Sequence, residues 1–210
     1  MKSKPLQHIP MTQIKNQILS SLEKRALVFV GLMGAGKSVI GKRVSTMLNL
    51  PFYDSDQEIE KAAQMTISEL FKIHGESEFR AFEQRIILNL IQKSPLVLAT
   101  GGGAYINEEI RKTIHENGIS IWLKVDLNTL MKRVSRNQTR PLLQTENPKE
   151  TMQKLMEQRY PIYAKANLTI NSHKKNRHTV AQNVIRSVQQ YLYTEKNDRN
   201  NKYASQNRHC

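Results

Sequence analysis

Short apolar runs alternate along this chain with longer stretches in which apolar residues recur every three or four positions. The runs have the length of buried strands and lie at residues 26–30, 52–53, 96–99, 119–125 and 168–170. The stretches between them predict helices over residues 37–48, 66–74, 76–92, 107–117, 126–134, 148–163 and 179–192. Strands separated by helices favour parallel pairing with helices on both faces of the sheet. The pattern therefore predicts a three-layer α/β/α fold.

The two ends of the chain differ from the middle. In residues 1–25, Ile14, Ile18 and Leu22 are four positions apart, which predicts a short helix within an N-terminal extension. Residues 26–194 carry the alternating pattern and form the predicted domain. Residues 195–210 are rich in Asn, Lys and Gln, and we expect them to be a disordered polar tail.

The composition fits one globular domain, since the chain has 210 residues of which 39% are hydrophobic. Its longest apolar stretch, residues 26–30, is far below the roughly 18–20 residues that cross a bilayer. Residues 1–24 lack the apolar segment of a secretory signal. The single cysteine, Cys210, excludes an internal disulfide framework and a multi-cysteine zinc site. We therefore expect a cytoplasmic protein without a membrane partner.

The formal net charge of +14 indicates that the chain attracts anions. Such a charge is typical of proteins that bind nucleic acid. It is equally suited to a site for small polyanions, because the basic residues are spread along the chain without an aromatic-rich basic stripe. We therefore expect no nucleic-acid partner, and a nucleotide-dependent nucleic-acid-binding protein stays as an alternative.

Residues Gly31 to Ser38 fit the phosphate-binding pattern G-x-x-x-x-G-K-[ST], and they stand between a predicted strand and a predicted helix. In such a loop the backbone N–H groups surround phosphate oxygens at a helix N-terminus. Lys37 would bridge the β- and γ-phosphates, and the Ser38 hydroxyl would coordinate Mg²⁺. The pattern predicts a nucleoside triphosphate site made by Gly34, Ala35, Gly36, Lys37, Ser38 and Val39.

Two carboxylates, Asp54 and Asp56, follow the second predicted strand. Side chains two residues apart on an extended segment point the same way, so both would face the phosphate site. One would hold Mg²⁺ through water while the other accepts a proton from a substrate hydroxyl, as phosphoryl transfer to an alcohol requires. The alternative is that Asp56 only caps the next helix.

Three glycines, Gly101, Gly102 and Gly103, follow the third apolar run. They allow a ligand to approach the backbone, although a plain tight turn would also explain them. Three arginines are further candidates for ligand contact: Arg80 after Phe79, Arg140 in a loop without periodicity, and Arg159 four residues before Tyr163. A mobile loop that carries one arginine is how small-molecule kinases exclude water from the transferring phosphoryl group.

Taken in order, six motifs resemble those of the shikimate kinase family, small P-loop enzymes of the nucleoside-monophosphate-kinase type. The resemblance covers residues 27–191. The motifs are Gly31–Ser38, Asp54–Asp56, Gly75-Glu76-x-x-Phe79-Arg80-x-x-Glu83, Gly101–Gly103, Arg140-Pro141-Leu142 and Arg159-x-x-x-Tyr163. Many families share the P-loop, whereas the ordered set is specific. The resemblance implies a five-stranded parallel sheet of the P-loop kinase type, with a lid at about residues 134–149.

The same resemblance implies an acceptor site for shikimate. Asp56 would bind the shikimate hydroxyls and act as base or as positioning group. Arg80 and Arg159 would hold the carboxylate, and the backbone of Gly101–Gly103 would contact the ring hydroxyls. The pocket wall would be formed by Phe71, Phe79, Glu83 and Leu142.

On the nucleotide side, the resemblance implies that Asp54 supports Mg²⁺ and that Arg133 lies near adenine. Arg140 would reach the γ-phosphate from the lid, which makes Asp56, Lys37 and Arg140 the expected catalytic residues. The chain departs from the family in one respect. The loop before the last helix usually contains a proline, and residues 172–180 have none. The adenine contacts therefore stay open.

The resemblance implies ATP-dependent phosphorylation of the 3-hydroxyl of shikimate, a step of aromatic amino-acid (chorismate) biosynthesis, with ATP and shikimate as substrates. We expect the enzyme to be a monomer that uses Mg²⁺. A related P-loop kinase for another hydroxy acid such as gluconate, or for a nucleotide, is the alternative within enzymes.

Overall fold

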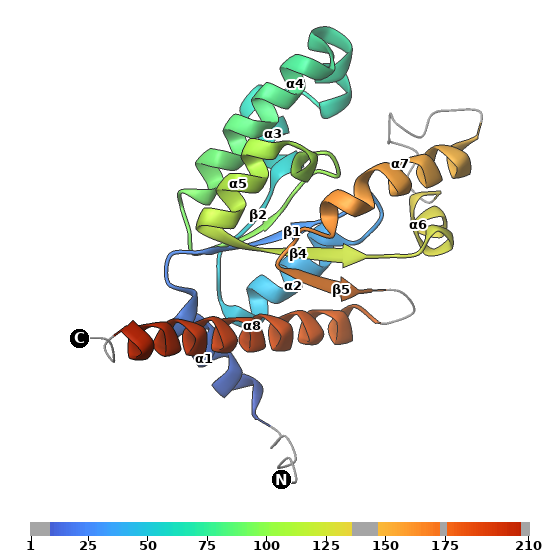
Figure 1. Ribbon diagram of the computed structural model, residues 1–210. Helices are drawn as coiled ribbons and strands as arrows, with labels where there is room; N and C mark the ends of the chain where they lie inside the picture. Colours follow the sequence, from blue (N-terminus) through green and yellow to red (C-terminus); the bar gives the residue numbers. More distant parts are fainter. Residues whose placement is uncertain (1–8, 136–146, 173–175, 207–210) are drawn as a thin grey trace.

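The computed structural model describes residues 9–135, 147–172 and 176–206 (Figure 1). The strands are β1 (Ala26–Val30), β2 (Phe52–Asp54), β3 (Val97–Ala99), β4 (Gly118–Lys124) and β5 (Leu168–Asn171). The helices are α1 (Met11–Leu22), α2 (Lys37–Leu48), α3 (Ser55–Ala63), α4 (Ile67–Ile91), α5 (Glu108–Asn117), α6 (Leu127–Val134), α7 (Pro148–Tyr163) and α8 (Arg177–Gln206), with a 3₁₀ turn η1 (Ala104–Ile106).

The five strands form one parallel sheet in the order β2-β3-β1-β4-β5. Helices α1, α2 and α8 lie on one face, and α4 and α5 lie on the other (Figure 1). The predicted α/β fold with a five-stranded parallel sheet is thus confirmed. Strand β1 is buried at every residue and lies between β3 and β4, so the loop that follows it opens at the middle of the sheet.

The register brings the carboxyl ends of three strands to one level. Phe29 of β1 and Asp54 of β2 both pair with Ala99 of β3. Neighbouring strands are about 4.8 Å apart. The loops after β1, β2 and β3 therefore leave the same edge of the sheet side by side, where ligands bind in open α/β sheets.

The N-terminal helix α1 forms where the spacing of its apolar residues predicts it. Ile14, Ile18 and Leu22 are buried in the same core as the sheet, and they pack against α8. Arg25, just after α1, pairs with Glu195 of α8 at 2.8 Å. Segment 11–25 is therefore part of the main packing of the domain.

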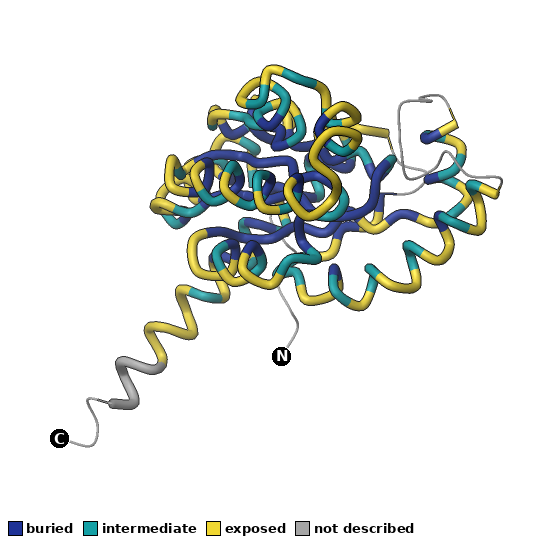
Figure 2. The backbone as a smooth tube through the Cα atoms, turned by 90° about the horizontal axis from the view of Figure 1, so that it is seen from above, coloured by how far each residue is buried: buried dark blue, intermediate teal, exposed yellow. Residues whose placement is uncertain are grey.

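The expectation of a disordered tail from residue 195 is wrong up to residue 206, because α8 continues to Gln206. No glycine or proline interrupts residues 177–206, and Lys, Gln and Arg have good helix propensity. The pair between Glu195 and Arg25 also fixes the helix just before it leaves the body of the protein. Figure 2 shows the exposed end of α8 projecting away from the sheet.

Helix α4 consists of two helical segments, as the sequence predicts. Thr66 and Glu69 form a capping box at its start. Gly75 interrupts the helix with φ 76° and ψ 177°, a conformation that favours glycine. The segment after Gly75 carries Phe79 and Glu83, both buried.

Among the described residues, no helix is long and apolar enough to span a membrane.

Candidate active site

The loop between β1 and α2 has the strand-loop-helix context that a phosphate-binding loop requires. Gly36 caps α2 with φ 94°, and Gly34 has φ 77°, so both positions favour glycine. Lys37 is 8% exposed, and its Nζ donates to the carbonyl oxygens of Gly31 at 2.8 Å and Leu32 at 3.0 Å. The ammonium group is therefore held against the loop that would enclose phosphate.

The two carboxylates after β2 lie in different conformations. Asp54 ends the strand, is buried, and accepts a hydrogen bond from the backbone N–H of Asp56 at 3.1 Å. Asp56 stands on the first turn of α3. The expectation that both side chains extend from one strand is therefore wrong, since the chain turns into a helix at Ser55. The cap of that helix is Asp54, and the capping alternative for Asp56 does not hold.

The glycine triplet lies where the acidic residues meet the phosphate-binding loop. A methyl group on Gly101 would lie 2.7 Å from Glu83 Oε1 and 2.8 Å from Asp56 Oδ1. A methyl group on Gly102 would lie 3.3 Å from the backbone nitrogen of Met33 in the loop after β1. Consecutive Cα atoms are about 3.8 Å apart. Asp56 and the phosphate-binding loop therefore contact neighbouring residues of one segment.

Arg80 lies over the third glycine, between an acidic and an aromatic group. Its Nη1 pairs with Glu83 at 2.7 Å, and its Nη2 pairs with Glu76 at 3.2 Å. The guanidinium carbon is 5.1 Å from the centre of the Phe79 ring, within cation–π range. A methyl group on Gly103 would lie 2.5 Å from Arg80 Nη1. Only glycine therefore allows the arginine this close to the backbone.

Charge and burial oppose each other in the Arg80–Glu83 pair. Burial lowers the pKa of Arg80, but Glu83 and Glu76 outweigh it, so the net pKa lies above the ordinary value. Glu83 is 1% exposed, and burial raises the pKa of its carboxyl; Arg80 opposes that rise and Asp56 adds to it. The family resemblance implied only that Glu83 forms part of the pocket wall. The structure shows in addition that Glu83 is the buried partner that holds Arg80 in place.

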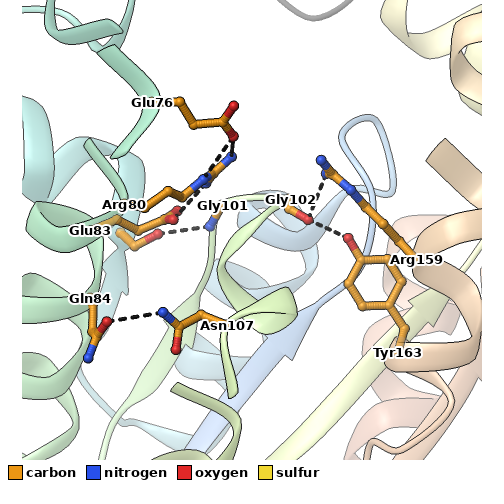
Figure 3. A network of polar contacts seen from close by, with 10 residues as sticks. Glu76, Arg80, Glu83, Gln84, Gly101, Gly102, Asn107, Arg159 and Tyr163 are labelled. Atoms are coloured by element: carbon orange, nitrogen blue, oxygen red, sulfur yellow. Dashed lines mark hydrogen bonds and ion pairs between the residues drawn. The ribbon is translucent and has the colours of Figure 1, made fainter. Parts of the chain in front are cut away.

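Arg159 and Tyr163 approach the triplet from the opposite side, one helical turn apart on α7. Arg159 Nη1 donates to the carbonyl oxygen of Gly102 at 3.2 Å, and the Tyr163 hydroxyl donates to the same oxygen. Figure 3 shows Arg80 on one side of Gly101 and Gly102 and Arg159 on the other. Burial raises the pKa of Tyr163 to about 12, so its hydroxyl stays a donor at neutral pH.

Arg133 of α6 lies beside the phosphate-binding loop. Its Nη1 donates to the carbonyl oxygens of Gly34 at 3.3 Å and Ala35 at 3.2 Å, and its Nη2 donates to that of Ser172 at 3.4 Å. Burial lowers the pKa of Arg133, and the nearby Arg177 lowers it further. Arg133 therefore bridges the loop and the segment that precedes α8.

Arg140, Leu142 and most of the predicted lid lie outside the described residues, as do residues 173–175 of the loop expected near adenine. Of the other expected positions, Ser38 and Val39 lie on the first turn of α2. Phe79 is buried in a small cluster with Ile59 and Leu70, against which Phe71 packs.

Three residues that hold this arrangement had no role predicted from the sequence. Ser55 Oγ accepts a hydrogen bond from the backbone N–H of Gly101 at 2.9 Å. Glu76 pairs with Arg80, and Tyr163 holds Gly102. The spacing of Tyr163 four residues after Arg159 is a sequence signal for it, since such residues share one helix face. No comparable signal marks Ser55.

The chain matches proteins of known class over most of its length. The family model described as shikimate kinase matches residues 33–189. The chain is 80% identical over 210 residues to a shikimate kinase of Bartonella henselae, and 78% identical over 210 residues to that of Bartonella quintana; both matches cover 100% of either chain.

A solved structure, the shikimate kinase of Acinetobacter baumannii in complex with shikimate, has a TM-score of 0.78 and 33% identity. That match covers 81% of this chain and 96% of the other. The match of the family model extends over more than half of the sequence, and the relatives match from end to end. The resemblance seen in the six motifs is therefore confirmed, and this chain belongs to the shikimate kinase family.

Proposed function

We propose that this chain transfers the γ-phosphoryl group of ATP to the 3-hydroxyl of shikimate, giving ADP and shikimate 3-phosphate. The observation that carries the proposal is that the glycine triplet lies close to both Asp56 and the phosphate-binding loop, so that a methyl group on Gly101 or Gly102 would touch one or the other. An acceptor hydroxyl beside Asp56 would lie next to a bound triphosphate, as direct transfer requires. The product would enter aromatic amino-acid (chorismate) biosynthesis.

On the nucleotide side, the backbone of Gly34, Ala35 and Gly36 would surround the phosphates at the N-terminus of α2. Lys37 would leave its carbonyl partners and stabilise charge on the β- and γ-phosphates. Arg133, which already contacts this loop, would lie at the nucleotide. Val39 would complete the nucleotide contacts on the first turn of α2. Arg140 of the lid would reach the γ-phosphate from outside the described residues.

The oxygen groups near the loop fit Mg²⁺. This ion keeps several waters and takes only one or two protein oxygens besides substrate phosphates. Ser38 offers a hydroxyl on the first turn of α2, and Asp54 offers a buried carboxylate at the same edge of the sheet. Within the described part of the chain, no group of three or more His, Cys, Asp or Glu could hold a metal alone. Mg²⁺ would therefore arrive with ATP and neutralise charge on its phosphates.

On the acceptor side, Arg80 and Arg159 would hold the shikimate carboxylate, because paired guanidinium groups bind carboxylates with two or more charge-assisted hydrogen bonds. Glu83 would keep Arg80 in place through the 2.7 Å pair. The backbone of Gly101–Gly103 would contact the ring hydroxyls. Asp56 would accept the proton of the attacking hydroxyl. Phe79, and Leu142 from the lid, would wall the pocket.

The test is a coupled ADP assay of the purified chain with shikimate, gluconate and nucleotide acceptors. The proposal predicts turnover of shikimate, dependent on Mg²⁺, and little with the other acceptors. Turnover of gluconate but not of shikimate would overturn the proposal in favour of a related kinase for another hydroxy acid. We also propose an active monomer, which light scattering at the mass of 24.2 kDa would test.

The basic charge leaves the nucleic-acid alternative to be tested separately. Binding through phosphate contacts weakens steeply as salt rises. A titration of labelled DNA and RNA near physiological salt should give no binding, while kinase activity is normal. Binding of DNA or RNA at this salt concentration that controls the nucleotide turnover would favour the nucleic-acid alternative.

A further inference from the structure

Tyr105 lies directly after the glycine triplet and belongs to no part of the site described above. It is the middle residue of η1, and the carbonyl oxygens of Gly101 and Gly103 accept the first backbone hydrogen bonds of this turn, from Ala104 and Ile106. The Tyr105 side chain is 4% exposed. A shift of this residue would therefore move the triplet with it.

The Tyr105 hydroxyl is held by a hydrogen bond to strand β4. It donates to Ser120 Oγ of β4 at 3.3 Å. Ser120 Oγ in turn donates to Asn167 Oδ1 at 2.7 Å and accepts from the Asn167 backbone N–H at 2.9 Å. The amide group of Asn167 donates to the Tyr191 hydroxyl of α8 at 3.0 Å. A buried serine therefore offers Tyr105 a fixed acceptor, because Asn167 holds that serine from both sides.

Tyr105 also supports the opposite wall of the acceptor site. Its ring lies 6.4 Å from the ring of Tyr163, centre to centre, in a stacked arrangement with an angle of 29° between the ring planes. Tyr163 is fully buried and donates to the Gly102 carbonyl, the same oxygen that Arg159 binds. Tyr105 thus contacts the triplet through the backbone and through Tyr163.

We propose that Tyr105 is a positioning residue for the acceptor: its hydroxyl, fixed by Ser120 and Asn167, sets the place of Gly101–Gly103 and of the Arg159–Tyr163 pair. This inference rests on the proposed function. Its effect falls on acceptor binding, because the residues that it supports are those assigned to the carboxylate and the ring hydroxyls. The phosphate-binding loop has other supports, Lys37 and Arg133.

The test is Tyr105→Phe, which removes one hydroxyl and leaves the ring in place. We expect the KM for shikimate to rise about threefold to tenfold, the effect of one buried hydrogen bond. The KM for ATP and the kcat should stay within about twofold of wild type. The wild-type enzyme is measured beside it, so absent shikimate turnover in wild type would refute the function, whereas only the ratio of the two KM values tests Tyr105.

The matched control is Tyr191→Phe, which removes a hydroxyl bonded to the same Asn167 on the side away from the triplet. It should leave the KM for shikimate within about twofold, with a loss of thermal stability similar to that of Tyr105→Phe. An unchanged KM in Tyr105→Phe, or an equal rise in both variants, would overturn the inference, since the hydroxyl would then serve stability alone.

Discussion

The nucleotide side and the acceptor side of this site are built in different ways. The phosphate-binding part of the nucleotide side is local: consecutive residues, from the loop after β1 to the first turn of α2, supply the backbone N–H groups, Lys37 and the Ser38 hydroxyl. Arg133 of α6 is added to it by a tertiary contact. The acceptor side is assembled from α3, α4, the glycine triplet and α7, and its contacts join distant positions, such as Arg159 and Gly102, which are 57 residues apart. The first depends on loop conformation, and the second on tertiary packing.

This difference predicts separable effects of mutation. Changes on the nucleotide side should reduce transfer to every acceptor. Changes among the residues that bind the acceptor should raise the KM for shikimate and leave the KM for ATP nearly unchanged. Asp56 lies between the two sides and should affect the chemical step itself.

The largest effect is expected for Lys37→Met, which removes the buried ammonium from the phosphate-binding loop. Loss of this charge should lower kcat about 10³-fold or more, because the group would stabilise charge in the transition state. The coupled ADP assay measures it, with Lys42→Met, an exposed position on the same helix, as control. A Lys37→Met enzyme with kcat within tenfold of wild type would contradict the assignment.

Asp56→Asn keeps the size of the side chain and removes its basic oxygen. The kcat should fall about 10²- to 10⁴-fold if Asp56 accepts the hydroxyl proton. Glu58→Gln, on the same first turn of α3, is the control for loss of negative charge at the helix N-terminus. A near-normal kcat in Asp56→Asn would leave Asp56 without a chemical role.

Arg159→Ala should raise the KM for shikimate about 10- to 10²-fold, since a charge-assisted hydrogen bond contributes about 1.5–3 kcal/mol. The kcat should change less. Lys154→Ala on the same helix is the control, because its pair with Glu150 at 2.8 Å is exposed and contributes little. An unaffected KM would exclude Arg159 from the carboxylate site.

The smallest effect is a change of stability with pH at Glu83. Its pKa is raised in the folded state, chiefly by burial, above the ordinary value of 4.5. Its contribution to stability is therefore present below pH 4.5 and is lost as the pH rises through the folded-state pKa. Urea unfolding between pH 4 and 7 measures this effect. The free energy of unfolding of the wild type should fall, relative to that of Glu83→Gln, as the pH rises. A rise in the free energy of unfolding of the wild type relative to Glu83→Gln would contradict a raised pKa of Glu83.

The fold was largely predictable because its signals are local. The five apolar runs form the five strands. At the start of four helices, the side chain of Thr66, Asn107, Asp126 or Asn147 accepts a hydrogen bond from a backbone N–H. The prediction of disorder was wrong for residues 195–206, because composition does not show the pair between Glu195 and Arg25. That contact depends on the packing of α1 against α8.

The acceptor site was less predictable for the same reason. The motifs named Asp56, Arg80 and Arg159, but the extended backbone expected at Asp56 was wrong, because α3 begins at Ser55 and Asp56 is helical. Glu83 pairs with Arg80 three residues away on α4, but its burial follows from tertiary packing. The role of Ser55 as acceptor for Gly101 follows from a tertiary contact. The phosphate-binding loop, by contrast, could be predicted from one run of consecutive residues.

The most direct test of the central claim is a crystal structure of the complex with ADP, Mg²⁺ and shikimate. The account predicts the shikimate carboxylate between Arg80 and Arg159, and the 3-hydroxyl within about 2.6–3.2 Å of an Asp56 oxygen. Shikimate bound elsewhere, or an Asp56 carboxylate that stays more than roughly 10 Å from Lys37 Nζ, beyond the reach of direct transfer, would contradict it.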